Sequence, residues 1–460
     1  MTGALTTLAM PRLAPRLTTP SGMKLGLAAI ALAAVVLGFA ARAAVDDQYR
    51  AVKTVCRDSA PSIVAAQHVA SGLADMEANL ANELLVPPAE EAAWVKAYEA
   101  RRQEATDALL AAAENITYGD AERKPIRAML LALPRFHGFA SLARRQHAAG
   151  DGAGAVVSYR EAAAVMSEQL MPAARQLDAA NAHVLDETYA ARAATARGMR
   201  ALVALAGLVL LAVLAGVQVF LTRRTRRVLN AGMLASTGLA LGFVGLTLAH
   251  LSASADDLRQ AREDAFASVH ALWQARAVAY EANTDESRWL LDPERRTRYA
   301  ADFATRANKI LHLPPGLTAA EVAELARRQQ LPRETSGYVA DELRNITFAG
   351  ELDAALKLLD TRDVYMKCDA KLRALEEGGD HREAVRYCLS TASGESDWAF
   401  EQFDAALTKV LEINDRAFER FSTEGFDQLE GMTSATVAAC VLIPFLAFLG
   451  LRPRLREYAA

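Results

Sequence analysis

The chain has 460 residues, of which 52% are hydrophobic and 23% charged, and its formal net charge is −4. This length suffices for two or three domains, and the weakly negative charge argues against nucleic acid as a partner. Alanine, leucine, glutamate and arginine dominate, and the Asn-Gly and Gly-Pro dipeptides typical of β-hairpins are absent. The composition therefore predicts an all-α protein.

Four apolar segments have the length of about 20 residues that a helix needs to cross a membrane. They cover residues 23–44, 201–221, 228–250 and 432–451. The two central segments contain no charged residue, and only the short stretch 222–227 separates them. We therefore predict an integral membrane protein with four transmembrane helices, in contact with membrane lipid.

Basic residues set the expected topology. Of the 51 lysines and arginines, ten lie in or beside the tails 1–22 and 452–460 and the loop 222–227, against one of the 55 acidic residues. The positive-inside rule places these three segments in the cytoplasm. In the loop, the basic residues are Arg223, Arg224, Arg226 and Arg227. Residues 45–200 and 251–431, which hold 40 basic and 54 acidic residues, are then outside the inner membrane.

The first apolar segment allows a second interpretation. Ala41-Arg42-Ala43 resembles the cleavage site of a secretory signal peptide, although the apolar run is longer than usual for one. Residues from Val45 onward lie outside the membrane in either case.

Both external segments show helical periodicity. In residues 45–200, one stripe of apolar side chains three and four positions apart comprises Ala66, Val69, Leu73, Met76 and Leu80. Four helices with short connections predict an up-down four-helix bundle there. Residues 251–431 repeat this plan, with 293–332 as an insertion.

Three motifs recur in the same order in the two halves. Glu77-Ala78-Asn79 matches Glu281-Ala282-Asn283, Asn115-Ile116-Thr117-Tyr118 matches Asn345-Ile346-Thr347-Phe348, and Gly150-Asp151 matches Gly379-Asp380. Because chance matches would not keep a common order, we predict that the two bundles are duplicates.

The sequence contains no metal-binding, phosphate-binding or nucleophile motif, so we expect no enzyme activity and no cofactor. The repeated polar residues are the candidate ligand-binding residues: Asn79, Asn115, Thr117, Asn283, Asn345 and Thr347. They would hold a small polar ligand or a partner protein between helices. The alternative is a structural role, in which the asparagines fix helix register or cap helix ends.

Two further pairs are candidates for structural roles. Gly238 and Gly242 form a Gly-x-x-x-Gly motif, which packs either against the other spans of the chain or in a homodimer. Cys368 and Cys388 flank the Gly378-Gly379 turn symmetrically and would face an oxidising compartment, so we predict a disulfide between them. The alternative is two buried free thiols.

A helical bundle outside the membrane, flanked by two spans, resembles the ligand-binding part of bacterial methyl-accepting chemotaxis receptors. The expected cytoplasmic segments are too short for the signalling helix of those receptors. Two bundles on four spans look more like an actinobacterial four-span membrane protein that senses amino acids and works between a solute-binding lipoprotein and a serine/threonine kinase.

This resemblance implies a non-catalytic sensor or relay subunit. It would detect a small molecule or a solute-binding protein outside and pass the signal to a cytoplasmic signalling protein. The alternatives are a structural scaffold of an envelope complex and an accessory subunit of a transporter.

Overall fold

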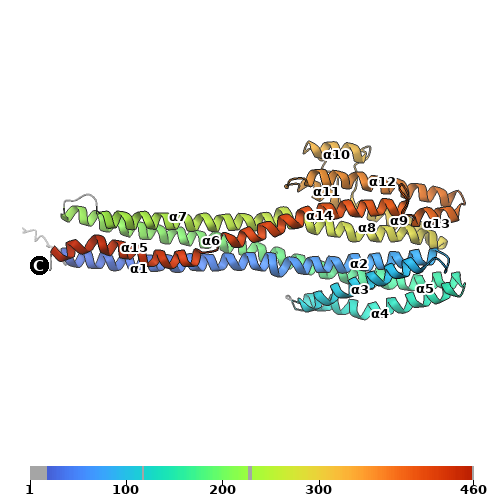
Figure 1. The fold of residues 1–460 in the computed structure, drawn as a ribbon, viewed down its shortest axis with the longest axis horizontal. Helices are drawn as coiled ribbons and strands as arrows, with labels where there is room; N and C mark the ends of the chain where they lie inside the picture. Colours follow the sequence, from blue (N-terminus) through green and yellow to red (C-terminus); the bar gives the residue numbers. More distant parts are fainter. Residues whose placement is uncertain (1–17, 117–118, 226–229, 458–460) are drawn as a thin grey trace, which may run out of the picture. The chain divides into compact units, whose positions relative to one another are not determined.

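The structure, a computed structural model, describes residues 18–116, 119–225 and 230–457 (Figure 1). In these residues the secondary structure is helical, apart from one antiparallel bridge between His312 and Ser336. Four helical stretches are long and apolar enough to cross a membrane: Thr19–Leu85, Gly152–Arg224, Ala231–Leu291 and Ser396–Glu457. The prediction of an all-α protein with four transmembrane helices is confirmed.

The chain divides into two compact units. We call one the transmembrane unit, which comprises residues 1–50, 192–255 and 426–460. The other, the large helical unit, comprises residues 51–191 and 256–425. Each unit is described by itself below.

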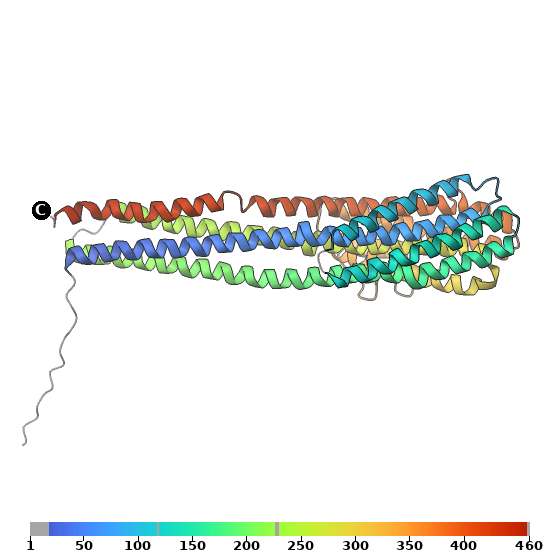
Figure 2. The ribbon, with the colours of Figure 1, turned by 90° about the horizontal axis from the view of Figure 1, so that it is seen from below.

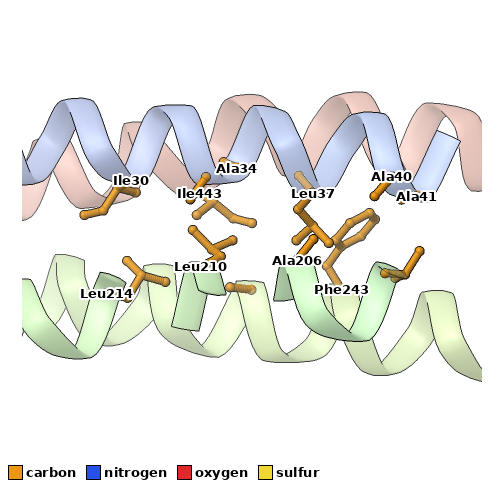
Figure 3. Close-up of a cluster of buried hydrophobic side chains, with 14 of the residues drawn as sticks. Ile30, Ala34, Leu37, Ala40, Ala41, Ala206, Leu210, Leu214, Phe243 and Ile443 are labelled. Atoms are coloured by element: carbon orange, nitrogen blue, oxygen red, sulfur yellow. The ribbon is translucent and has the colours of Figure 1, made fainter. Parts of the chain in front are cut away.

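Four helices build the transmembrane unit. They are α1 (Thr19–Val52), the later part of α6 (Met171–Thr225), most of α7 (Ala231–Arg259), and α15 (Met432–Glu457). Their inner faces form one apolar core, in which Leu37, Leu210 and Ile443 meet (Figure 3). On the outer faces, large apolar side chains stay exposed, for example Leu208 at 63% and Leu241 at 62%. Exposed leucines are expected where a helix faces lipid.

Small residues let two of these helices approach closely. A Cβ atom added to Gly232 of α7 would lie 2.6 Å from the Cα atom of Gly450 in α15. Nearby, the Ser236 hydroxyl donates a hydrogen bond of 2.8 Å to the carbonyl oxygen of Ile443. Gly238 and Gly242 differ, because nothing lies within 4 Å of a Cβ added to either residue. Packing of this motif against the other described spans is therefore excluded, and its role in a dimer stays a prediction.

Two helix ends differ from the expected boundaries. Helix α1 begins at Thr19 rather than at residue 23, since Pro20 is well suited to a first helical turn. Helix α6 continues to Thr225, so Arg223 and Arg224 belong to its last turn instead of a loop. Arg226, Arg227 and most of the N-terminal tail lie outside the described residues.

The large helical unit contains both halves of the chain. The first half contributes α2 (Ala60–Leu85), α3 (Ala92–Glu114), α4 (Asp120–Ala148), α5 (Gly152–Val165), the π-helical η2 (Met166–Leu170) and the start of α6. The second contributes α8 (Ala267–Leu291), η4 (Pro293–Arg295), α9 (Arg296–Ile310), α10 (Ala319–Arg327), α11 (Tyr338–Arg344), α12 (Glu351–Glu377), α13 (His381–Leu389) and most of α14 (Ser396–Asp427). Within the first half, helices α4 and α5 pack against each other (Figure 2).

Helices α2 and α8 bring the two halves together. They pack against each other, and the stripe predicted on α2, from Ala66 to Leu80, is buried. The sequence predicted two separate bundles, whereas the structure places both halves in one compact unit. The duplication itself stays a prediction.

The glutamates of the repeated motifs explain this union of the halves. Glu77 of α2 forms a buried ion pair with Arg288 of α8. Reciprocally, Glu281 of α8 pairs with Arg175 of α6, at 2.5 Å. Because a buried charge without a partner is costly, each half stabilises a carboxylate of the other.

Each half enters the large helical unit through a seven-residue π-helical segment. The first, η1 (Lys53–Ser59), directly precedes α2, and the second, η3 (Gln260–Phe266), directly precedes α8. The two segments contact each other. Wider helical turns of this kind occur frequently at functional sites.

Candidate functional site: two adjoining cavities

Helices α2, α3, α8 and α14 line a cavity of about 470 Å³ that is partly open to solvent, and we call it the acidic cavity. This volume lies within the range of about 300–1,000 Å³ found for small-molecule sites. Its walls combine carboxylates, amides and aromatic rings, including Asp75, Asn79, Asn82, Trp94, Arg101, Glu104, Tyr280, Asn283, Asp397, Phe400, Glu401 and Asp404.

Two arginines in or beside the acidic cavity are already neutralised. Arg101 of α3 lies 2.5 Å from the Asp75 carboxylate and 2.6 Å from that of Glu104. Arg276 of α8 donates two hydrogen bonds, of 2.7 and 2.9 Å, to the carboxylate of Asp404. Neither guanidinium is therefore left over to balance the other carboxylates of this cavity.

Asp397 and Glu401 supply the uncompensated negative charge. They lie four residues apart on α14, so both point to the same side of the helix. Neither forms an ion pair or a hydrogen bond with the residues that the structure describes. Burial, with the nearby carboxylates of Glu401 and Asp75, raises the pKa of Asp397 to about 7. Burial likewise raises the pKa of Asp75 to about 6, against the opposing effect of Arg101.

A second cavity, of about 460 Å³, adjoins the first, and we call it the apolar cavity. The two cavities share Asp75, Arg101, Glu104 and Tyr280 in their walls. The remaining walls are mostly apolar and include Ala60, Pro61, Val64, Ala65, Val269, Phe266 and Phe418. Ala60 and Pro61 directly follow η1, and Phe266 is the last residue of η3. The contents of this cavity therefore touch the ends of both π-helical segments.

The structure brings together two of the predicted site residues. Asn79 and Asn283 both line the acidic cavity, one from each half. The Asn79 amide donates hydrogen bonds of 2.8 Å to the backbone oxygen and the carboxylate of Asp75. The Asn283 side chain has no hydrogen-bond partner in the described part of the chain, which leaves its amide available to a ligand.

The other predicted site residues that the structure describes lie at helix ends and do not line either cavity. Asn115 caps α3 and donates to the Ser62 hydroxyl at 2.7 Å, and Asn345 caps α11 and donates to the Ser268 hydroxyl at 3.0 Å. The backbone N–H of Thr347 donates to the Glu351 carboxylate at 2.6 Å. The structural interpretation fits these three residues, whereas Thr117 lies outside the described residues.

Sequence reasoning missed the charged residues of the site. Asp397, Glu401 and Asp404 alternate with the buried Phe400 and Phe403 along α14. Carboxylates that border an apolar stripe so closely were the available signal. It was not decisive, because the boundary of an amphipathic helix looks the same when it faces water.

The predicted disulfide is not formed in the structure, in which Cys368 and Cys388 are both free and buried. The Cys368 thiol points to the carbonyl oxygen of Gly394, at 3.7 Å. The Cys388 side chain is oriented toward the Ser287 hydroxyl on α8. Equal distance from the turn matches the two cysteines along the helices, but it does not fix the directions of their side chains.

The fold and the cavities define a class of protein: a multi-pass helical membrane protein with a ligand-sized site in its large helical unit. Residues 51–190 match the family described as the actinobacterial sensor domain. This match coincides with the first segment of the large helical unit, Ala51–Ala191. It supports an actinobacterial protein with a sensing role. No curated protein and no solved structure matches the chain.

Proposed function

We propose that the chain is a non-catalytic sensor subunit of the inner membrane, which binds a small polar ligand in the two cavities and relays its presence to a cytoplasmic protein. In this proposal, the large helical unit lies on the outer side of the inner membrane, and both termini lie in the cytoplasm. The distribution of basic residues supports this orientation.

One observation carries the proposal. Helices α2 and α8, which wall the cavities, belong to the continuous helical stretches Thr19–Leu85 and Ala231–Leu291, each of which also contains a candidate span. Helix α14, which walls the acidic cavity as well, leads to the candidate span of α15 through a short turn at residues 428–431. A ligand that draws α2 and α8 together would therefore shift helices that are continuous in the chain with candidate spans. Small translations or rotations of packed helices are a known form of switching.

The π-helical segments η1 and η3 give this relay a point of adjustment. They follow the candidate spans of α1 and α7 in the chain, precede α2 and α8, and border the apolar cavity. A π-helical turn that changes to an α-helical turn rotates the helix on one side of it relative to the other. We expect an occupied cavity to favour one of the two states.

Hydrogen–deuterium exchange of the full chain in lipid nanodiscs tests the relay. A panel of amino acids, amines and small carboxylates is added, and exchange is measured by peptide. A ligand that protects the cavity walls on α2, α3, α8 and α14 should also change exchange in 53–59 and 260–266. Protection of the walls with unchanged exchange in both π-helical segments would contradict the relay.

A solute-binding protein is the second form of input. The resemblance to the four-span relay favours it, and a cleft of about 820 Å³ between the α2–α3 connection and α13 offers it a surface of mixed charged and apolar side chains. Exchange protection at Glu90 and Arg386 by such a protein, with the cavity walls unaffected, would support docking in place of direct ligand binding.

A further inference from the structure

The charge of the acidic cavity limits the ligands that it accepts. Arg101 is balanced by Asp75 and Glu104, and Arg276 by Asp404. Asp397 and Glu401 are left without a cationic partner in the part of the chain that the structure describes. An anionic ligand would add to this repulsion and would find no free guanidinium. A cationic ligand would relieve it.

The type of cation follows from the other walls. No group of three His, Cys, Asp or Glu side chains in the described residues is arranged to hold a metal ion. Trp94, Tyr280 and Phe400 instead place aromatic rings in the walls of the cavity, and the faces of aromatic rings attract organic cations. The free amide of Asn283 offers an oxygen that accepts a hydrogen bond from an N–H group.

The adjoining apolar cavity accounts for the rest of the ligand. It has part of its wall in common with the acidic cavity, and the rest of its wall consists mainly of alanine, valine, proline and phenylalanine. A molecule with an ammonium group in one cavity and an apolar body in the other satisfies both sets of walls.

We infer that the two cavities together bind a small organic ammonium ion, with Asp397 and Glu401 as its counter-charges and the apolar cavity as the site of its hydrocarbon body. This inference rests on the proposed sensing function and names its class of ligand. An acidic helix face without a ligand would need no aromatic walls and no cavity beside it.

Binding should depend on pH. The raised pKa of Asp397, about 7, means that this carboxyl is partly protonated near neutrality. It shares the cavity with Asp75 of α2, Arg101 and Glu104 of α3, Tyr280 of α8, and Glu401 and Asp404 of α14. A cation favours the ionised form of Asp397, so affinity should rise between pH 6 and pH 8 and binding should release protons.

A matched series of probes tests the inference: 2-phenylethylammonium, the neutral 2-phenylethanol and the anionic 3-phenylpropionate. Isothermal titration calorimetry uses the full chain in nanodiscs of zwitterionic lipid, because anionic lipid would itself bind the cation. We expect the cation to bind at least tenfold more tightly than the neutral alcohol. The double variant Asp397→Asn, Glu401→Gln should lose at least tenfold in affinity for the cation, and Glu412→Gln, an exposed carboxylate of the same helix, should lose none.

The outcomes separate this inference from the sensing function. Equal affinity for cation and alcohol, or a cation affinity unchanged in the double variant, overturns the inference. If the alcohol or the carboxylate protects the cavity walls from exchange better than the cation, the ammonium class is wrong while the sensing function stands. If the cation binds through Asp397 and Glu401 but exchange in 53–59 and 260–266 is unchanged, the ammonium site stands and the relay fails. Loss of folding in the double variant would show in its melting curve, in which case the single variant Glu401→Gln, at an exposed position, replaces it.

Discussion

Asn79 of α2 and Asn283 of α8 face the same acidic cavity from opposite halves of the chain, yet their amides are used differently. Asn79 is bound to the buried Asp75, whereas Asn283 has no partner among the described residues. Two residues in matching sequence motifs thus have different expected effects when they are replaced.

Replacement of these asparagines by leucine should separate ligand binding from stability. Asn283→Leu loses no hydrogen bond, so we expect stability to change by less than about 0.5 kcal/mol while ligand affinity falls. Asn79→Leu removes a hydrogen bond to a buried carboxylate and should cost about 1–3 kcal/mol. Chemical denaturation and calorimetric titration of both variants measure the two effects, and normal ligand response in Asn283→Leu would remove this residue from the site.

The buried ion pair between the halves should be essential to the large helical unit. Arg288→Met leaves the buried carboxylates of Glu77 and Asp285 without their shared arginine, which should cost about 3–5 kcal/mol. Arg298→Met on α9, which removes an exposed pair with Asp302, is the control and should cost less than about 1 kcal/mol. Urea unfolding followed by circular dichroism compares the two. Equal losses would show that the halves do not depend on this contact.

Glu342 should make stability depend on pH. Burial and the facing carboxylate of Glu351 raise its pKa from 4.5 to about 8. The folded protein therefore keeps a proton that the unfolded chain releases, so this contribution is fully present below about pH 4.5 and is lost as pH rises through 8. Glu342→Gln should melt at a higher temperature than the native protein at pH 8.5 and show a smaller decline from pH 5. Asp341→Asn, an exposed neighbour, should leave the native pH dependence unchanged.

Two glycines of α7 should respond differently to added volume. Gly232→Val would force a side chain into the backbone of Gly450, with an expected loss of about 1–3 kcal/mol from overpacking. Gly238→Val has open space around it and should leave the fold of the chain intact. Size-exclusion chromatography with light scattering in detergent then reads the oligomeric state. If the predicted homodimer forms through Gly238 and Gly242, Gly238→Val should yield monomers, and an unchanged mass would end that prediction.

The proposed topology has a direct test. A reporter that is active only in the cytoplasm should function when fused after Ala460 and should be silent when inserted near Gly152 or Gly379. The reverse pattern would invert the orientation and with it the relay.

The sequence by itself determined the helices and the spans. Burial on one face repeats every three or four residues within a helix, so the stripe from Ala66 to Leu80 and the span around Leu210 can be read locally. Asn79 and Asn283 were found because they recur in matching motifs of the two halves.

Only the tertiary structure decided what lies between the helices. Glu77 pairs with Arg288 and Arg276 pairs with Asp404, whereas Asp397 has no partner among the described residues. Each of these results depends on how helices far apart in the sequence are rotated against one another. A periodic pattern gives the face that a helix buries but not the partner that covers it. The union of both halves in one unit, the free thiols of Cys368 and Cys388 and the charge of the acidic cavity all follow from those rotations.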